Sequence, residues 1–209
     1  NGKTTDDPTQ AATLKSALKN DVAMINMKTG LDLFSEEESN GVIDPARVGA
    51  IGWCMGGEQA LLLSLKDPRV KATAIFYGPL VTDPSQLKHL QGPVLGIFGN
   101  DDKAPSTADV EAFKKGLAAA GKTDVTIYQF DNVGHAFASK AAEKVGLYHP
   151  EQAKDAWAKI GGRDHGVGDA KAMVRTTCQS HGHPTTHIVT IRTGSFVTIH
   201  TSTDEIKTI

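Results

Sequence analysis

Cysteine is scarce in this sequence, since only Cys54 and Cys178 occur among its 209 residues. Two cysteines so far apart, in different sequence surroundings, do not form a disulfide framework, and reduced thiols are the simpler expectation. Reduced thiols favour a cytoplasmic location. The chain opens with Asn1 and has no basic-then-apolar leader. We therefore expect no signal peptide, and a processed or shortened start is equally compatible with this opening.

Long apolar runs are missing as well. The longest, residues 94–98 and 60–65, fall far short of the ~18 residues that cross a bilayer. Charge of one sign is not in excess either, because 22 basic residues stand against 24 acidic ones, for a formal charge of −2. No stretch is dense in Lys and Arg. We therefore expect neither a membrane nor a nucleic acid as a partner.

Short apolar runs alternate with helical spans from residue 47 onward. The expected strands are residues 48–53, 72–77, 94–98 and 125–130, and the expected helices are residues 56–66, 107–120 and 151–160. Two further helices are expected over residues 7–38, joined near Lys19 and Asn20. Near-continuous apolar strands separated by helices are typical of a parallel sheet covered on both faces. The sequence therefore predicts an α/β fold.

The composition changes beyond residue 160. Residues 161–209 contain ten Thr and five of the eight His, and residues 187–200 are candidates for a β-hairpin. We expect residues 1–160 to form the α/β domain and the rest to be a tail, detached or weakly packed because it offers few apolar side chains. Metal-ligand residue types gather at Cys178, His181, His183 and His187, but without the paired spacing of known sites. We favour a solvated tail over a metal site.

A glycine-rich turn carries the clearest chemical signal. Gly52 and Gly56 stand two residues before and two residues after Cys54, between a predicted strand and a predicted helix. Small residues at these positions let a tight strand-to-helix turn close, which is the arrangement of a nucleophile elbow. The helix N-terminus would favour a Cys54 thiolate, and the Met55 N–H could face a developing oxyanion. The alternative is a buried structural cysteine with glycines for close packing.

Two further candidates follow other predicted strands. Asp101 and Asp102 come after residues 94–98, and His135 comes after residues 125–130. Taken singly, such aspartates more often belong to turns and such a histidine to the surface or core. The order nucleophile, acid, histidine is that of the α/β-hydrolases, and parallel sheets assemble their sites at the C-terminal ends of their strands. All three together favour a catalytic set.

The residues around these candidates resemble the dienelactone hydrolase family. The resemblance runs through residues 44–57, 76–78, 99–102 and 134–137 and covers about residues 2–159. It implies a three-layer α/β-hydrolase sandwich with Cys54 as nucleophile, His135 as base and Asp102, rather than Asp101, as the orienting acid. It also implies that Tyr77 lies near the substrate pocket, although an ordinary strand-end aromatic would fit the same position. No cofactor or metal is implied.

The family resemblance implies a hydrolase that opens lactones or esters of small carboxylic acids through an acyl-enzyme. The alternatives are a general carboxylesterase or thioesterase of the same fold, or an inactive domain that acts at most as a binding module. Family members place further strands and an oxyanion loop ahead of the stretch that begins at Gly2. We therefore expect the first strands to be missing and an unpaired sheet edge beside residues 48–53. The sequence leaves oligomeric state and physiological substrate open.

Overall fold

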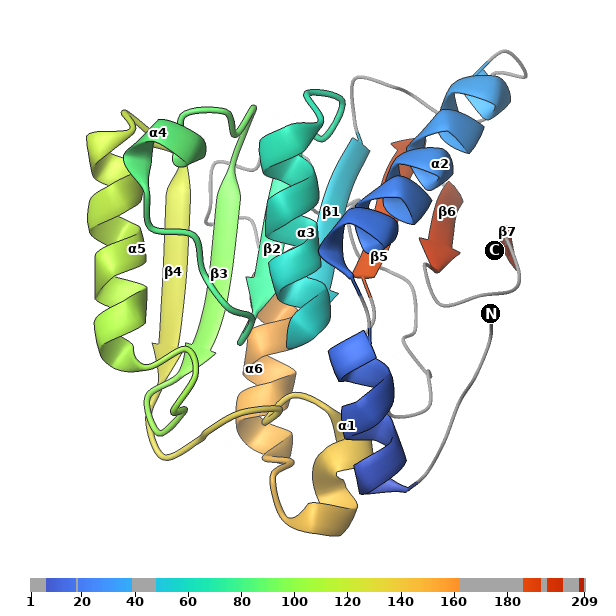
Figure 1. Ribbon diagram of the computed structural model, residues 1–209. Coiled ribbons are helices and arrows are strands. Elements are labelled where there is room, and N and C mark those ends of the chain that lie inside the picture. The colour runs from blue at the N-terminus through green and yellow to red at the C-terminus, as the bar shows by residue number, and fades with distance from the viewer. Residues whose placement is uncertain are drawn as a thin grey trace.

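A seven-stranded sheet runs through the protein in the order β4-β3-β2-β1-β5-β6-β7 (Figure 1). The computed structural model describes residues 7–17, 19–38, 48–161, 186–192, 195–200 and 207–208. The strands are β1 (Val48–Trp53), β2 (Ala72–Phe76), β3 (Val94–Gly99), β4 (Val125–Phe130), β5 (Thr186–Arg192), β6 (Ser195–His200) and β7 (Lys207–Thr208). The helices are α1 (Pro8–Ala17), α2 (Asn20–Glu38), α3 (Met55–Lys66), α4 (Pro84–Leu87), α5 (Thr107–Ala119), the 3-10 helix η2 (Lys140–Val145) and α6 (Pro150–Gly161).

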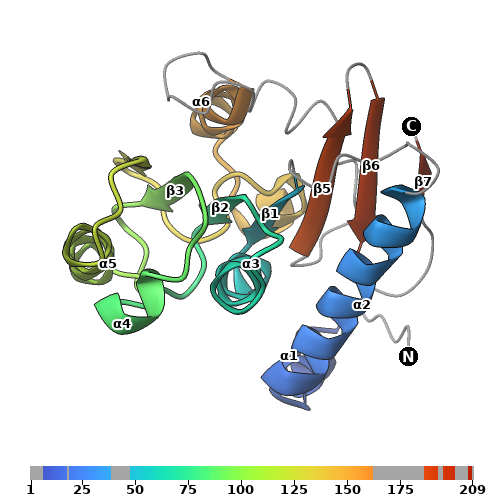
Figure 2. The ribbon, with the colours of Figure 1, turned by 90° about the horizontal axis from the view of Figure 1, so that it is seen from above.

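Strands β1 to β4 are parallel to one another, as the sequence predicted. Helices α2, α3 and α5 lie on one face of the sheet, and α6 lies on the other (Figure 2). This three-layer arrangement follows from strands that are apolar on both faces and must be covered on both. The predicted α/β class is confirmed. Within the described residues, no helix is both long enough and apolar enough to cross a membrane.

The core follows the two-residue period of the strands. In β1, Ala50 packs with α2 and α3, whereas Ile51 packs on the α6 side. In β2, Ile75 joins the cluster beneath α5 and Phe76 joins the one beneath α6. On the α6 side the rings of Trp53 and Trp157 lie 5.4 Å apart, which ties the end of β1 to α6.

The expectation of a bare edge beside β1 and a detached tail is wrong. Strand β5 pairs antiparallel with β1, with Val48 opposite Thr190 and Gly52 opposite Thr186. The hairpin expected over residues 187–200 corresponds to β5 and β6, which pair antiparallel with each other. Backbone N–H and C=O groups along β1 need partners whatever the side chains are. The expectation of a detached tail considered only apolar side chains and left out the hydrogen bonds that the β1 backbone needs. The candidate ligands Cys178, His181 and His183 lie outside the described residues.

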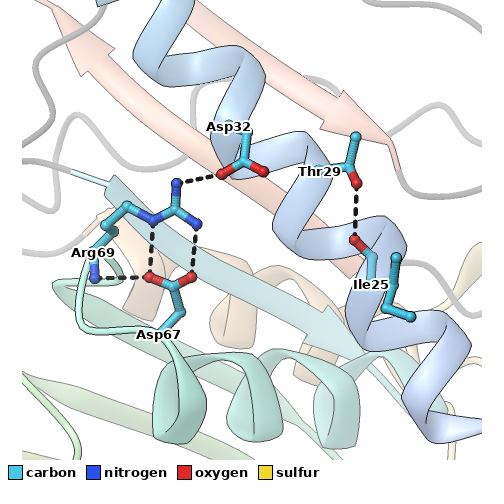
Figure 3. Close-up of polar contacts among 5 residues, drawn as sticks. All are labelled: Ile25, Thr29, Asp32, Asp67 and Arg69. Atoms are coloured by element: carbon cyan, nitrogen blue, oxygen red, sulfur yellow. Dashed lines mark hydrogen bonds and ion pairs between the residues drawn. The ribbon is translucent and has the colours of Figure 1, made fainter.

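Helix α2 is held to the sheet layer by an arginine in the connection between α3 and β2 (Figure 3). Arg69 donates from Nε and Nη2 to the two carboxylate oxygens of Asp67, at 2.9 and 2.7 Å. Its Nη1 donates to Asp32 on α2 at 2.7 Å. The hydrogen bond to Arg69 lowers the pKa of Asp67, and the hydrogen bond to Asp67 raises the pKa of Arg69. The pairing keeps the nearly buried Asp67 carboxylate charged and supplies both of its oxygens with hydrogen-bond donors.

Candidate active site

Cys54 lies in the turn between β1 and α3, in a backbone conformation that side chains rarely adopt, with φ 55° and ψ −124°. The turn closes because its neighbours have no side chains. A Cβ on Gly52 would lie 2.0 Å from the carbonyl oxygen of Gly56, and one on Gly78 would lie 2.7 Å from that of Cys54. The Cys54 N–H donates to the Phe76 carbonyl at 2.9 Å. The local sequence therefore dictates a sharp elbow with Cys54 at its apex.

The structure brings together three of the residues that the sequence singled out. Cys54 Sγ lies 2.9 Å from His135 Nε2, and His135 Nδ1 lies 2.9 Å from Asp102 Oδ2. A carboxylate accepts hydrogen bonds only, so Nδ1 carries a proton and donates it to Asp102. Nε2 then faces the sulfur. Asp101 is exposed and its N–H donates to the Val133 carbonyl, so Asp102 is the carboxylate that contacts the imidazole.

Asp102 is held in place from its other side. It is 8% exposed, and its Oδ1 accepts a hydrogen bond from the Ala104 N–H at 3.0 Å. A carboxylate fixed at one oxygen by backbone presents the second oxygen in a set direction. His135, whose side chain is 35% exposed, therefore has one ring nitrogen anchored and the other available to the sulfur.

The contacts on both sides of His135 change its titration. The pKa of His135 is raised to about 9, and the largest cause is the hydrogen bond to Cys54. The charges of Cys54 and Asp102 and the hydrogen bond to Asp102 act in the same direction, whereas partial burial lowers the pKa. An imidazole that keeps its proton near neutral pH favours a thiolate on the neighbouring sulfur. The raised pKa of His135 therefore agrees with the thiolate that the sequence predicts at Cys54, and that thiolate stays a prediction.

Tyr77 directly follows β2 and lies beside the imidazole. Its ring centroid is 5.3 Å from that of His135 and 5.7 Å from that of Phe137, with edge-to-face geometry in both cases. The side chain is 1% exposed, and its N–H donates to the Ile97 carbonyl at 2.9 Å. Tyr77 therefore packs edge-to-face against the His135 ring. Its predicted contact with substrate stays a prediction.

Left-handed backbone is concentrated at this edge of the sheet. The described non-glycine residues with positive φ are Cys54, Tyr77, Asn132 and Ala136. Each follows a strand of the parallel sheet or adjoins His135. Such conformations cost on the order of 1–3 kcal/mol each and persist where the surroundings enforce them, commonly at functional sites. Sequence reasoning missed Asn132 and Ala136, and only asparagine's tolerance of this conformation gave a signal.

The first turn of α3 begins with the backbone N–H that the sequence predicts as an oxyanion donor, and that role stays a prediction. Met55 is the first residue of the helix, so its N–H is one of the four that a helix leaves without an intrahelical acceptor. It directly follows Cys54, which is the position of an oxyanion donor in a nucleophile elbow. In the described ranges, no three His, Cys, Asp or Glu side chains gather as a potential metal site.

The sequence model of the dienelactone hydrolase family matches residues 1–161. The chain belongs to this family. Relatives named "Putative carboxymethylenebutenolidase" include one from Methylorubrum extorquens, 35% identical over 133 residues, covering 59% of this chain and 44% of the relative. Another, from Salmonella typhimurium, is 32% identical over 167 residues, covering 74% of this chain and 60% of the relative. The chain thus spans about half the length of these relatives.

A solved structure from the same family is also similar to this chain. It is that of a "Putative Dienelactone Hydrolase" from Klebsiella pneumoniae subsp. pneumoniae, with 31% sequence identity and a TM-score of 0.47. The similarity covers 53% of this chain and 48% of that chain.

Proposed function

We propose that this protein is a hydrolase that opens lactones or esters of small carboxylic acids through a Cys54-His135-Asp102 triad, without a cofactor. The observation that carries the proposal is the continuous contact from Asp102 Oδ2 through the His135 ring to Cys54 Sγ, with both distances at 2.9 Å. Nucleophile, base and orienting carboxylate in one line are the recurring arrangement for acyl transfer. Membership of the dienelactone hydrolase family supports the same reaction.

In the first half-reaction the Cys54 thiolate attacks the carbonyl carbon of the substrate and forms a C–S bond. Negative charge then develops on the carbonyl oxygen, where the Met55 N–H can donate a hydrogen bond to it. The C–O bond to the leaving oxygen breaks as the carbonyl re-forms, and the His135 imidazolium gives its proton to that oxygen. In a lactone the new hydroxyl stays attached to the acyl group, and the product of this step is a thioester.

In the second half-reaction water attacks the thioester. His135, now neutral, takes a proton from the water at Nε2, while Nδ1 stays hydrogen-bonded to Asp102. The C–S bond breaks, the carboxylic acid leaves, and Cys54 returns to a thiolate beside an imidazolium. Asp102 orients the ring and stabilises its positive charge in both half-reactions.

The names of the relatives, rather than the walls of a pocket, guide the choice of substrate. The name carboxymethylenebutenolidase, which those relatives carry, denotes an enzyme that opens an unsaturated lactone. We therefore propose unsaturated lactones of the class named in the relatives, ahead of general carboxylesters and thioesters.

The test is to follow hydrolysis of p-nitrophenyl acetate and of an unsaturated five-membered lactone. We expect turnover of both, and its loss in Cys54→Ala, which removes the nucleophile and little volume. Cys178→Ala is the matched control, because it removes the only other thiol of the chain. Turnover that survives Cys54→Ala unchanged would refute the nucleophile, and turnover of the ester alone would refute the lactone preference.

A further inference from the structure

Four polar side chains form a row across the carboxyl ends of β3 and β4. Lys114 Nζ on α5 donates to Gln129 Oε1 at 2.7 Å, and Gln129 Nε2 donates to Asn100 Oδ1 at 3.0 Å. Asn100 Nδ2 in turn donates to Asp131 Oδ1 at 2.5 Å. We refer to Lys114, Gln129, Asn100 and Asp131 as the amide relay.

The two ends of the relay fix its direction. An ammonium group only donates hydrogen bonds and a carboxylate only accepts them. Gln129 must therefore turn its oxygen to Lys114, and Asn100 must turn its nitrogen to Asp131, so neither amide is free to flip. Hydrogen bonds that run in one direction polarise and strengthen one another. The relay is thus a single directed unit from a cation to an anion.

The relay joins the two loops that carry the triad's acid and base. Asn100 lies two residues before Asp102, and Asp131 lies four residues before His135. The loops approach closely, because a Cβ on Gly99 would lie 2.2 Å from the Val133 carbonyl oxygen. Any slip between these loops would therefore change the distance from Asp102 to the imidazole.

The relay also brackets the strained turn that leads to His135. Asn132 has φ 59°, and its predecessor Asp131 is held by the Asn100 side chain. On the other side, the Val133 carbonyl accepts the Asp101 N–H at 3.0 Å. A left-handed residue persists when its surroundings over-determine it. Here the hydrogen bond to Asn100 fixes one side of the turn and the backbone bond fixes the other.

We propose that the amide relay is a positioning network that holds the His135 loop against the Asp102 loop, and so maintains the hydrogen bond between His135 Nδ1 and Asp102 Oδ2. No member of the relay takes part in the chemistry itself. Only the expected change in kcat rests on the proposed function. The position of the imidazole can be measured without any substrate.

The breaking variant is Asn100→Leu, which keeps the approximate size of the side chain, removes both relay hydrogen bonds and leaves the charge unchanged. We expect kcat for p-nitrophenyl acetate to fall about tenfold or more, because small misplacements of a catalytic group have large effects on rate. KM should change less than about twofold, since the substrate contacts remain. The pKa of His135, followed by NMR of its ring nitrogens, should fall as its contact with Asp102 loosens.

The restoring variant exchanges the two ends of the final hydrogen bond. In Asn100→Asp the two carboxylates face each other, and kcat should again fall. In the double variant Asn100→Asp/Asp131→Asn the total charge is that of the wild type, and the amide now donates to the carboxylate. We expect it to recover the wild-type kcat and the wild-type pKa of His135. Asp131→Asn alone is the control, because its amide oxygen can still accept from Asn100.

Several outcomes would overturn the positioning role. Asn100→Leu with the wild-type kcat and pKa of His135 would do so, as would a double variant no better than Asn100→Asp. If Asn100→Leu fails to fold, the comparison of Asn100→Asp with the double variant decides alone. If the wild type hydrolyses nothing, the proposed function fails, and the pKa of His135 together with the rate of Cys54 alkylation by iodoacetamide still decides the role of the relay.

Discussion

Replacing Gly52 by alanine tests whether the turn around Cys54 depends on the absence of a side chain at this position. The added Cβ would lie 2.0 Å from the Gly56 carbonyl oxygen, 2.2 Å from its carbonyl carbon and 2.7 Å from the Gly57 nitrogen. All three atoms belong to the backbone of the first turn of α3, so no side chain can rotate away. Ordinary contacts lie near 3.5 Å, and the turn must therefore open by about 1 Å or more.

The magnitude follows from this displacement. Overpacking against backbone costs about 3 kcal/mol, at the upper end of the usual range. In a chain of this size that lowers the melting temperature by roughly 6–12 °C. Cys54 lies two residues from the substitution, so it moves away from His135 as the turn opens. A displacement of about 1 Å at the reacting group reduces turnover by up to about a hundredfold.

The assay combines thermal melting by circular dichroism with the pH dependence of Cys54 alkylation by iodoacetamide. The control is Gly121→Ala, where φ is +72° and the added Cβ meets nothing within 4 Å. That variant should lose about 1 kcal/mol through backbone strain alone and keep the wild-type reactivity of Cys54. If Gly52→Ala melts and reacts as the wild type does, the steric account of the elbow is refuted.

Three further predictions test the groups around the elbow and the docking of α2. Cys54→Ala removes the largest cause of the raised pKa of His135, so the ring should lose its proton well below the wild-type value of about 9 in an NMR titration; an unchanged value would contradict the pairing. Asp102→Asn should lower kcat by about a hundredfold or more with KM little changed, and wild-type turnover would exclude Asp102 as the orienting acid. In urea unfolding, Asp32→Ala, at a 65% exposed carboxylate, should cost less than about 1 kcal/mol. Arg69→Met leaves the nearly buried Asp67 carboxylate without its cation and should lower the free energy of unfolding by about 1–3 kcal/mol. Equal losses in Asp32→Ala and Arg69→Met would contradict this difference between the two carboxylates.

The parallel half of the fold could be predicted because its signals are local. The four strands and the helices between them appear in the sequence as apolar runs and as three- and four-residue periodicities. The convergence of Cys54, Asp102 and His135 was predictable from their order and from their places just after parallel strands. The choice of Asp102 over Asp101 depended on the family resemblance. Their catalytic roles stay predictions.

The amide relay and the pairing of a C-terminal strand with β1 could not be predicted, because they depend on contacts between segments far apart in the sequence. The pairing of β5 with β1 joins segments more than 130 residues apart in the sequence. The backbone groups of β1 that need this partner cannot be recognised from side-chain composition. The amide relay was equally hidden, because Gln129 and Asn100 are ordinary polar residues until the strands place them side by side. Short elements such as α4 and η2 carry too few residues for a periodicity to show.

The contact between Trp53 and Trp157 has a practical consequence for spectroscopy. These are the only two tryptophans of the chain, and their rings lie 5.4 Å apart across the junction of β1 and α6. The tryptophan fluorescence of the protein, excited selectively over tyrosine, therefore arises from one place in the fold, next to Cys54. An emission change on denaturation reports the separation of α6 from the sheet, whereas far-ultraviolet dichroism reports all helices together. Coincidence of the two signals would mean that the α6 layer and the remaining helices unfold in one cooperative step.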